Sequence, residues 1–409
     1  MLPPLLVEGI LLAQIALLVL LHKALCQIQG QLAAKLETTV AATTMPNPTA
    51  PHVVAARIVD GGAPTTSARL RSGTIEGVQP PIVRTNLEEA PAIAHKLPPA
   101  ASRPTVATLL PEVVKPGWSA AEECLPFCDE EMEIVRKLYQ WLGGERVHQT
   151  PRDLLACFVR GYAYRADWAE ASCAFLDRAL TWRAQCGADQ MCMQEPPPRR
   201  SLFESLVRSA PIGFDKEGHP LILERFGAVE PAKLLSSFDE ASFLRHQTYS
   251  REASRLYAAA NSARRRKRLY KSVAVVDMRG LSMSHVNRQM LKLMQNMYAL
   301  FGWHYPESIH KFYVINAPWI FRTLWAGVKV WMHPITVRKF DILGSDYMDD
   351  FAKAGVQLTG GVIPEQLSGW WEQVRELQQA HDLSQLNHCG GFIPEADECE
   401  LARLATALT

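Results

Sequence analysis

Helical periodicity dominates the pattern of apolar and polar residues in the first ordered part of this chain. Apolar side chains recur three and four positions apart over residues 130–142, 153–162 and 168–183, which predicts three amphipathic helices. Gly187 follows the last of them and is expected to end it. The pattern therefore predicts a small helical lobe ahead of the proline run at 196–198.

Short apolar runs alternate with helical segments after this proline run. Strands are predicted at residues 221–226, 273–278 and 312–315, separated by predicted helices at 240–260 and 284–301. A strand, a helix and a second strand in this order predict a right-handed crossover and parallel pairing. A further strand at 339–343 gives a mixed sheet faced by helices, which is the α/β class.

An aromatic helix is predicted directly after the strand at 312–315. It begins near Trp319, ends at Pro334, and carries an unusually wide apolar face. That face comprises Trp319, Phe321, Leu324, Trp325, Val328, Trp331 and Met332. A buried core helix is one interpretation of this pattern, and a gate over an apolar pocket is the other.

The chain begins with an apolar stretch over residues 2–21, interrupted by Glu8 and Gln14. This length could just cross a bilayer, and the lysines that follow it favour a cytosolic location for the remainder. We interpret the stretch as an uncleaved anchor; a signal peptide and a translation-start artefact are the alternatives. The predicted division is an anchor at 1–27, a disordered Ala/Pro/Thr-rich linker at 28–118, a helical lobe at 119–195, a sheet lobe at 196–375 and a tail at 376–409.

Charge is nearly balanced over the 409 residues, with 43 Lys and Arg against 42 Asp and Glu. Attraction to an anionic partner therefore needs a local patch. One basic run is expected in an exposed loop, and it consists of Arg264, Arg265, Arg266, Lys267 and Arg268. We interpret this basic run as a patch that attracts an anionic membrane surface rather than as a specific binding site for nucleic acid. The nine cysteines form no CxxC pair, which indicates reduced thiols, and no metal site is predicted.

Several blocks of this sequence resemble the signature motifs of the CRAL-TRIO lipid-transfer family. They are DKEGHPLILERFG at 215–227, VAVVDMRGLS at 273–282, YPE at 305–307, INAPWIF at 315–321 and PITVRKFDILG at 334–344. The resemblance covers roughly residues 119–371. It implies a CRAL-TRIO fold, in which a small N-terminal helical lobe precedes a mixed, largely parallel sheet whose helices enclose an apolar lipid pocket with a helical gate.

The same resemblance implies a headgroup site. Thr336 and Lys339 would hold a phosphate, and Glu307 is expected to lie near that lysine. The helical leader retains Arg160 of a basic block, so the resemblance groups Arg160 with the headgroup residues, but Cys157 and Tyr162 stand where basic residues are common. This departure argues against a polyphosphorylated inositol headgroup and leaves phosphatidylinositol itself.

These features predict a protein that binds a phospholipid, phosphatidylinositol or phosphatidylcholine, and transfers or presents it at cytosolic membrane surfaces without chemical change. The alternative is a membrane-tethered lipid sensor that recruits a protein partner. An enzyme is the third hypothesis, but residue order identifies no nucleophile or paired carboxylates, and His219, His304, His310 and His333 are interpreted as structural or solvent-facing. No cofactor is predicted beyond the bound phospholipid.

Overall fold

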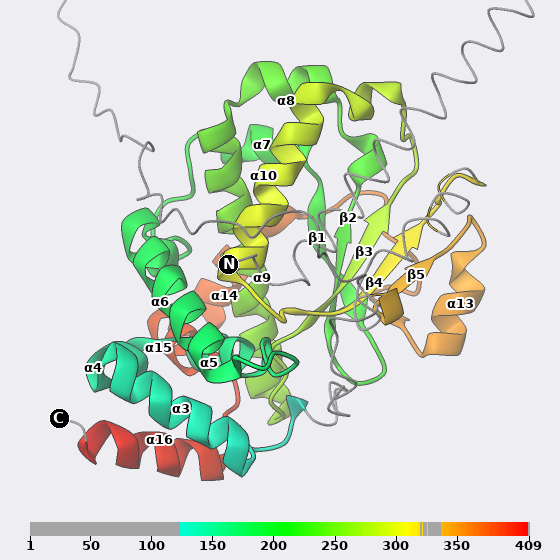
Figure 1. Ribbon diagram of the computed structural model, residues 1–409. Coiled ribbons are helices and arrows are strands. Elements are labelled where there is room, and N and C mark those ends of the chain that lie inside the picture. The colour runs from blue at the N-terminus through cyan, green and yellow to red at the C-terminus, as the bar shows by residue number, and fades with distance from the viewer. Residues whose placement is uncertain (1–122, 320, 322–324, 326–336, 408–409) are drawn as a thin grey trace, which may run out of the picture. The chain divides into compact units, whose positions relative to one another are not determined.

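The computed structural model describes residues 123–319, 321, 325 and 337–407, all of which fall within one compact unit (Figure 1). The predicted anchor and linker lie outside the described residues, as do Leu324, Val328, Trp331, Met332 and Thr336. None of the helices in the described part of the chain is both long and apolar enough to span a membrane.

The helical lobe is built from α3 (Asp129–Leu142), α4 (Gly144–Gln149), α5 (Arg152–Arg160) and α6 (Trp168–Cys186). Their apolar faces share one core, as the periodicity predicts. Gly187 ends α6 in the left-handed region with φ of 68°, a conformation that glycine adopts without a steric penalty. The end of the predicted tail belongs to this lobe, because α16 (Glu395–Ala407) places Leu401 and Leu404 in the same core, whereas Leu383 and Leu386 of the tail pack with α9.

The sheet has six strands in the order β5-β4-β3-β2-β1-β6. Strands β2 (Pro220–Glu224), β3 (Ser272–Asp277), β4 (Ile309–Ile315) and β5 (Phe340–Ile342) pair in parallel. Two further strands, β1 (Ser209–Phe214) and β6 (Gln357–Leu358), pair antiparallel at one edge, and the sequence pattern did not predict them. The predicted α/β class and mixed, largely parallel sheet are confirmed.

The two faces of the sheet are covered by different helices, as Figure 1 shows for α10 and α13. The other elements are α7 (Arg200–Leu206), α8 (Pro231–Ser237), α9 (Glu240–Arg265), α10 (Arg288–His304), α13 (Tyr347–Ala354), α14 (Gly369–Ala380), α15 (Leu383–Cys389) and the short turns η3 (Ala188–Gln190), η4 (Phe226–Ala228) and η5 (Met283–Val286). Ile222 packs with α9 and α14, whereas its neighbours Leu221 and Leu223 pack with α13 on the opposite face. Alternate residues of a strand face opposite sides, so β2 is buried on both.

The basic run is not the single exposed loop that the sequence predicts. Helix α9 continues to Arg265, so Arg264 and Arg265 form its last turn and Arg266 caps it in the left-handed region. Arg264 and Arg265 both donate to the side-chain oxygen of Asn261. Arg268 is buried and forms an ion pair with Asp397 of α16. The exposed patch therefore loses Arg268, because that side chain joins α16 to the rest of the molecule.

Candidate functional site

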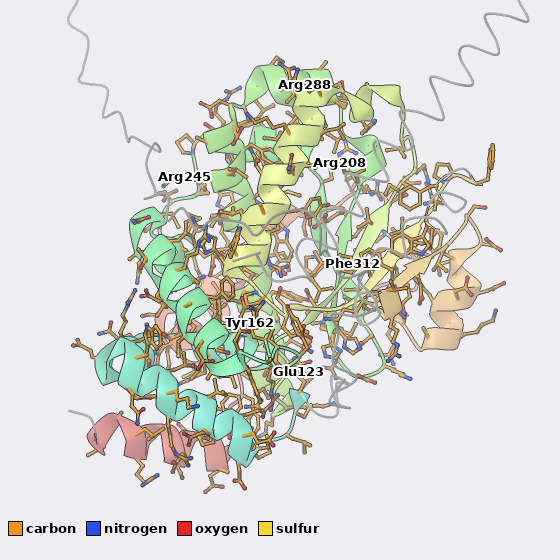
Figure 2. All side chains as sticks on the ribbon, viewed as in Figure 1. Glu123, Tyr162, Arg208, Arg245, Arg288 and Phe312 are labelled. Carbon is orange, nitrogen blue, oxygen red and sulfur yellow. The ribbon has the colours of Figure 1, made fainter. Side chains whose placement is uncertain are left out.

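A cavity lies between the sheet and the helices α9 and α10, and the space between its atoms amounts to about 1600 Å³ when the part open to solvent is included. Its floor follows from strand register: Ile222, Ala274 and Phe312 are partners across β2, β3 and β4, so they lie side by side on one face. Figure 2 labels two lining residues, Phe312 and Arg208.

The two helical walls of this cavity differ in polarity. Helix α10 contributes Met290, Met294, Met297 and Phe301, whose spacing of about one helical turn places them on one apolar face. Helix α9 contributes a polar stripe formed by Gln247, Ser250, Arg251 and Ser254, which has the same spacing. The cavity can therefore accept hydrocarbon against α10 and the sheet, and polar groups against α9.

Three charged side chains meet at one end of the cavity. Lys271 and Lys339 both contact the same oxygen of Glu307: Nζ of Lys271 lies 2.8 Å, and Nζ of Lys339 3.1 Å, from Oε1. Lys339 also donates to the carbonyl oxygen of Ile309 at 3.0 Å. Glu307 and Lys339 line the cavity, whereas Lys271 is not among the lining residues. The structure thus brings Glu307 and Lys339 together and adds a second cation.

This cluster, which we call the lysine pair, follows from the ends of adjacent strands. Lys271 directly precedes β3, Glu307 lies two residues before β4, and Lys339 directly precedes β5. Because these three strands are parallel and adjacent, their starts lie at one edge of the sheet. Glu307 has φ of 49°, a region that is uncommon for residues other than glycine.

Electrostatics separate the roles of the two lysines. Burial raises the pKa of Glu307, but the two ammonium groups outweigh burial and bring it to about 2. Burial lowers the pKa of Lys271, yet attraction to Glu307 outweighs it, and the net shift is upward. For Lys339 the effect of burial outweighs the attraction to Glu307, so the pKa of Lys339 lies below the usual value. The ammonium of Lys339 is therefore the less stabilised charge, and it is the one that faces the cavity.

Arg160 lies elsewhere. Its guanidinium donates to both carboxylate oxygens of Glu131 at 2.9 and 3.1 Å, and to the carbonyl oxygens of Glu123 and Leu125, both at 3.2 Å. It is buried and does not line the cavity. The side chain of Arg160 is thus engaged by α3 and the segment before it and does not reach the cavity, although the next residue, Gly161, lies against Pro306 and Glu307.

The described residues of the predicted gate occupy different environments. Trp319 is 68% exposed, whereas Phe321 is buried. The ring of Trp325 lies 5.0 Å from that of Phe340, which stacks at 4.4 Å on Phe312 of the cavity floor. Trp325 therefore contacts the cavity lining through the ring of Phe340.

The sequence analysis did not identify two charged residues that line the cavity. Glu224 shares the cavity face of β2 with Ile222, and burial raises the pKa of its carboxyl, which Arg251 only partly offsets. The guanidinium of Arg251 donates to the hydroxyl of Ser308 and lies 5.5 Å from the ring of Tyr305. A sequence signal existed for Glu224, the one charged residue of an otherwise buried strand, but not for Arg251, because α9 carries several other charges.

One group of side chains in the described part of the chain has the composition of a metal site. Asp215, Glu217, His219 and His310 each offer a ligand atom, and these atoms lie within 4.8 Å of one another. None of the four lines the cavity. This cluster is distinct from the lysine pair, although both lie where the parallel strands begin.

Comparison with known proteins gives one matching family. Residues 210–367 match the family described as CRAL/TRIO domain. Two similar relatives are phosphatidylinositol/phosphatidylcholine transfer protein SFH9 of Arabidopsis thaliana, 27% identical over 47% of this chain and 33% of that protein, and SEC14 cytosolic factor of Kluyveromyces lactis, 27% identical over 49% and 65%. A solved structure titled "Crystal structure of Sfh5" aligns with a TM-score of 0.44 at 16% identity, covering 63% of this chain and 100% of that one.

The chain spans about a third of the length of the first curated relatives that it matches, with 33%, 32% and 36% of those proteins covered. The matched residues 210–367 include the sheet from β1 to β6, the helices α9 and α10, and the lysine pair. The region of likeness thus forms most of the cavity, whose lining also includes Val207, Arg208, Ser209 and Trp370.

Proposed function

We propose that this chain, which contains a CRAL/TRIO domain, binds one phospholipid in the cavity of its sheet lobe and transfers or presents it at a membrane surface without chemical change. Phosphatidylinositol is the favoured ligand and phosphatidylcholine the second, as in the names of its relatives. The single observation that carries the proposal is the ammonium of Lys339, paired with Glu307, at one end of a largely apolar cavity.

The cavity walls supply the energy for holding acyl chains. Each buried methylene is worth about 0.8 kcal/mol, so roughly 30 methylenes would cost more than about 20 kcal/mol if exposed to water. A phospholipid in transit must therefore be enclosed. The methionines of α10 suit this role because their flexible side chains fit chains of varied shape.

The headgroup phosphate is proposed to lie at Lys339. Two ammonium groups and one carboxylate leave a net charge of +1 in the lysine pair, and a phosphate would compensate it. Glu307 holds the amine of Lys339 in place while phosphate is absent. Thr336, which lies outside the described residues, is proposed to add a hydroxyl donor to the same phosphate.

The predicted gate and membrane patch remain part of the proposal. Trp319 offers an exposed aromatic ring suited to a membrane interface, and Trp325 contacts the aromatic pair at the floor. Arg264, Arg265, Arg266 and Lys267 are proposed to attract an anionic surface, at about 1 kcal/mol each. Arg268 is excluded because it is buried against Asp397.

The test is mass spectrometry of lipid that co-purifies with the full-length chain and with Lys339→Met. We expect one phospholipid class in the parent and at least a tenfold lower amount in the variant, because a buried phosphate would lose its cation. The matched control is Lys311→Met, which removes a lysine of β4 that pairs with Asp341 outside the cavity. A parent that carries no phospholipid, or a Lys339→Met variant that retains it in full, would contradict the proposal.

Transfer is measured separately, by movement of labelled phosphatidylinositol between vesicles. Loss of transfer in Lys339→Met but not in Lys311→Met is the expected result. A chain that holds phospholipid but transfers none would support the lipid-sensing alternative instead.

A further inference from the structure

The cluster of Asp215, Glu217, His219 and His310 is formed by two segments that are far apart in sequence. Asp215, Glu217 and His219 belong to the turn between β1 and β2, and His310 is the second residue of β4. The starts of β2 and β4 lie at the same edge of the sheet, with only β3 between them. The turn thereby brings two carboxylates to the imidazole of His310.

The geometry of three ligand atoms is close to that of a metal site. Nε2 of His310 lies 3.9 Å from Oδ2 of Asp215 and 3.8 Å from Oε2 of Glu217. Around zinc, ligands at about 2.0–2.1 Å in a tetrahedron are separated by roughly 3.3–3.4 Å. A contraction of about half an ångström would bring Nε2 of His310 to that separation from each carboxylate oxygen, and all the ligand atoms of the cluster already lie within 4.8 Å of one another.

One of these atoms lacks a hydrogen-bond partner in the described part of the chain, and a second has room for a cation. Oε2 of Glu217 is buried and, among the described residues, has no hydrogen-bond partner. An unpartnered buried carboxylate oxygen is costly. Oδ2 of Asp215 accepts from Nδ1 of His219 at 2.8 Å and keeps further lone pairs for a cation. Oδ1 of the same carboxylate is occupied by the backbone N–H groups of residues 217–219, which fixes its orientation.

His219 supports the cluster rather than completing it. Its two ring nitrogens lie 2.8 Å from Asp215 and 2.9 Å from Oε2 of Glu123, so both are engaged. Its ring stacks on that of His310 with centroids 4.1 Å apart, which sets the plane of the His310 imidazole. Second partners of this kind orient the ligands of many metal sites.

We propose that Asp215, Glu217 and His310 bind one zinc ion, with a water molecule as the fourth ligand. Imidazole together with carboxylates suits zinc, and the two carboxylate charges balance the divalent ion. The ion would fasten the β1–β2 turn to the start of β4, one residue from Ile309, whose carbonyl oxygen accepts from Lys339. This site is independent of the proposed lipid function, since none of its residues lines the cavity.

The test uses tag-free full-length protein, freed of metal by chelation and titrated with zinc chloride in a calorimeter. We expect one zinc per chain and a rise in the melting temperature on binding, because an ion that binds only the folded state stabilises it. Glu217→Gln and His310→Gln should each weaken zinc binding by at least about tenfold. The matched control is His381→Gln, which alters an exposed histidine just after α14 and should leave binding unchanged.

Cobalt substitution identifies the ligands. A four-coordinate cobalt spectrum without a thiolate charge-transfer band is expected from one imidazole and two carboxylates. A thiolate band would place the ion on cysteine and overturn the assignment, as would zinc affinity unaltered in Glu217→Gln, or no binding in the parent. Phospholipid content is measured on the same samples, so failure of the zinc site leaves the lipid proposal standing.

Discussion

Two lysines share one carboxylate oxygen in this protein, yet they are not equivalent. Lys271 is fully buried and its charge is stabilised by Glu307, whereas Lys339 faces the cavity and is destabilised by burial. Removing one partner of a buried ion pair is costly when it leaves the other charge uncompensated. The two lysines should therefore contribute differently to the free energy of unfolding.

We predict that Lys271→Met lowers the free energy of unfolding by about 3–5 kcal/mol, because it removes the closer cation of Glu307. Lys339→Met should cost less than about 2 kcal/mol, since Lys271 still neutralises that carboxylate. Urea denaturation of both variants measures the difference, with Lys311→Met as the control. Equal losses in the two variants would show that Lys339 is as much a structural cation as Lys271.

The sequence could identify Lys339 and Glu307 but not Lys271. Lys339 and Glu307 lie in motifs that resemble those of a known family, and that resemblance predicts that the two side chains are close together. Lys271 precedes a strand, where a lysine is ordinarily solvated, and its burial depends on a carboxylate 36 residues further along the chain. Local pattern carries no information about such a partner.

At the scale of elements, apolar periodicity located α3, α5, α6, α9 and α10, but it missed the shorter helices and did not show which surfaces the helices contact. Helix α16 falls in the predicted tail, yet Leu401 and Leu404 lie in the core of the helical lobe, and buried Asp397 accepts from the backbone N–H of Phe127. Apolar and polar residues are only weakly separated between the two faces of α16, because alanines occupy positions on both. A short alanine-rich helix gives little sign of whether it is docked.

We predict that Leu401→Ala lowers the free energy of unfolding by about 2–5 kcal/mol, as expected for a buried leucine in a packed core. The control is Arg403→Ala on the exposed side of α16, which should stay within about 1 kcal/mol of the parent because its pair with Glu400 is exposed. Chemical denaturation of full-length protein measures both. A neutral Leu401→Ala would mean that α16 is not docked in solution.

There are physical reasons why the sequence pattern did not predict β1 and β6. Strand β1 contains Pro211 and Gly213, residues that the sequence analysis associates with turns, and a register shift falls between them. Strand β6 has two residues, too few to show alternation. Helix α9 extends past residue 260, where the polar side chains of Asn261 and Ser262 are buried because they donate to the carbonyl oxygens of Gly218 and Lys267.

At the scale of the whole molecule, one buried ionic network joins the helical lobe to the sheet lobe. Glu252 of α9 accepts from Arg183 of α6 at 2.8 and 3.0 Å, and Arg255 of α9 contacts Asp153 of α5 at 2.9 Å. Tyr305, which lines the cavity, donates its hydroxyl to the same Glu252. The lobes are therefore coupled through charges taken almost wholly out of water.

This network makes stability depend on pH. Burial raises the pKa of Glu252, but Arg183 and Arg255 outweigh it and bring the pKa to about 2, below the ordinary 4.5. A carboxyl with a depressed pKa in the folded state contributes stability that is present above about pH 4.5 and is lost as the pH falls toward 2. A shift of this size corresponds to on the order of 3 kcal/mol.

We predict that Glu252→Gln lowers the free energy of unfolding by about 3–5 kcal/mol at pH 7, and that its difference from the parent shrinks to about 1–2 kcal/mol near pH 2, where the parent carboxyl is itself half protonated. Urea denaturation at a series of pH values measures it. Glu145→Gln, in an exposed turn of α4, should stay within about 0.5 kcal/mol of the parent at pH 7. A Glu252→Gln difference that stayed constant with pH would assign its cost to lost packing and hydrogen bonds, and the lobes would then be held together without a net contribution from this charge.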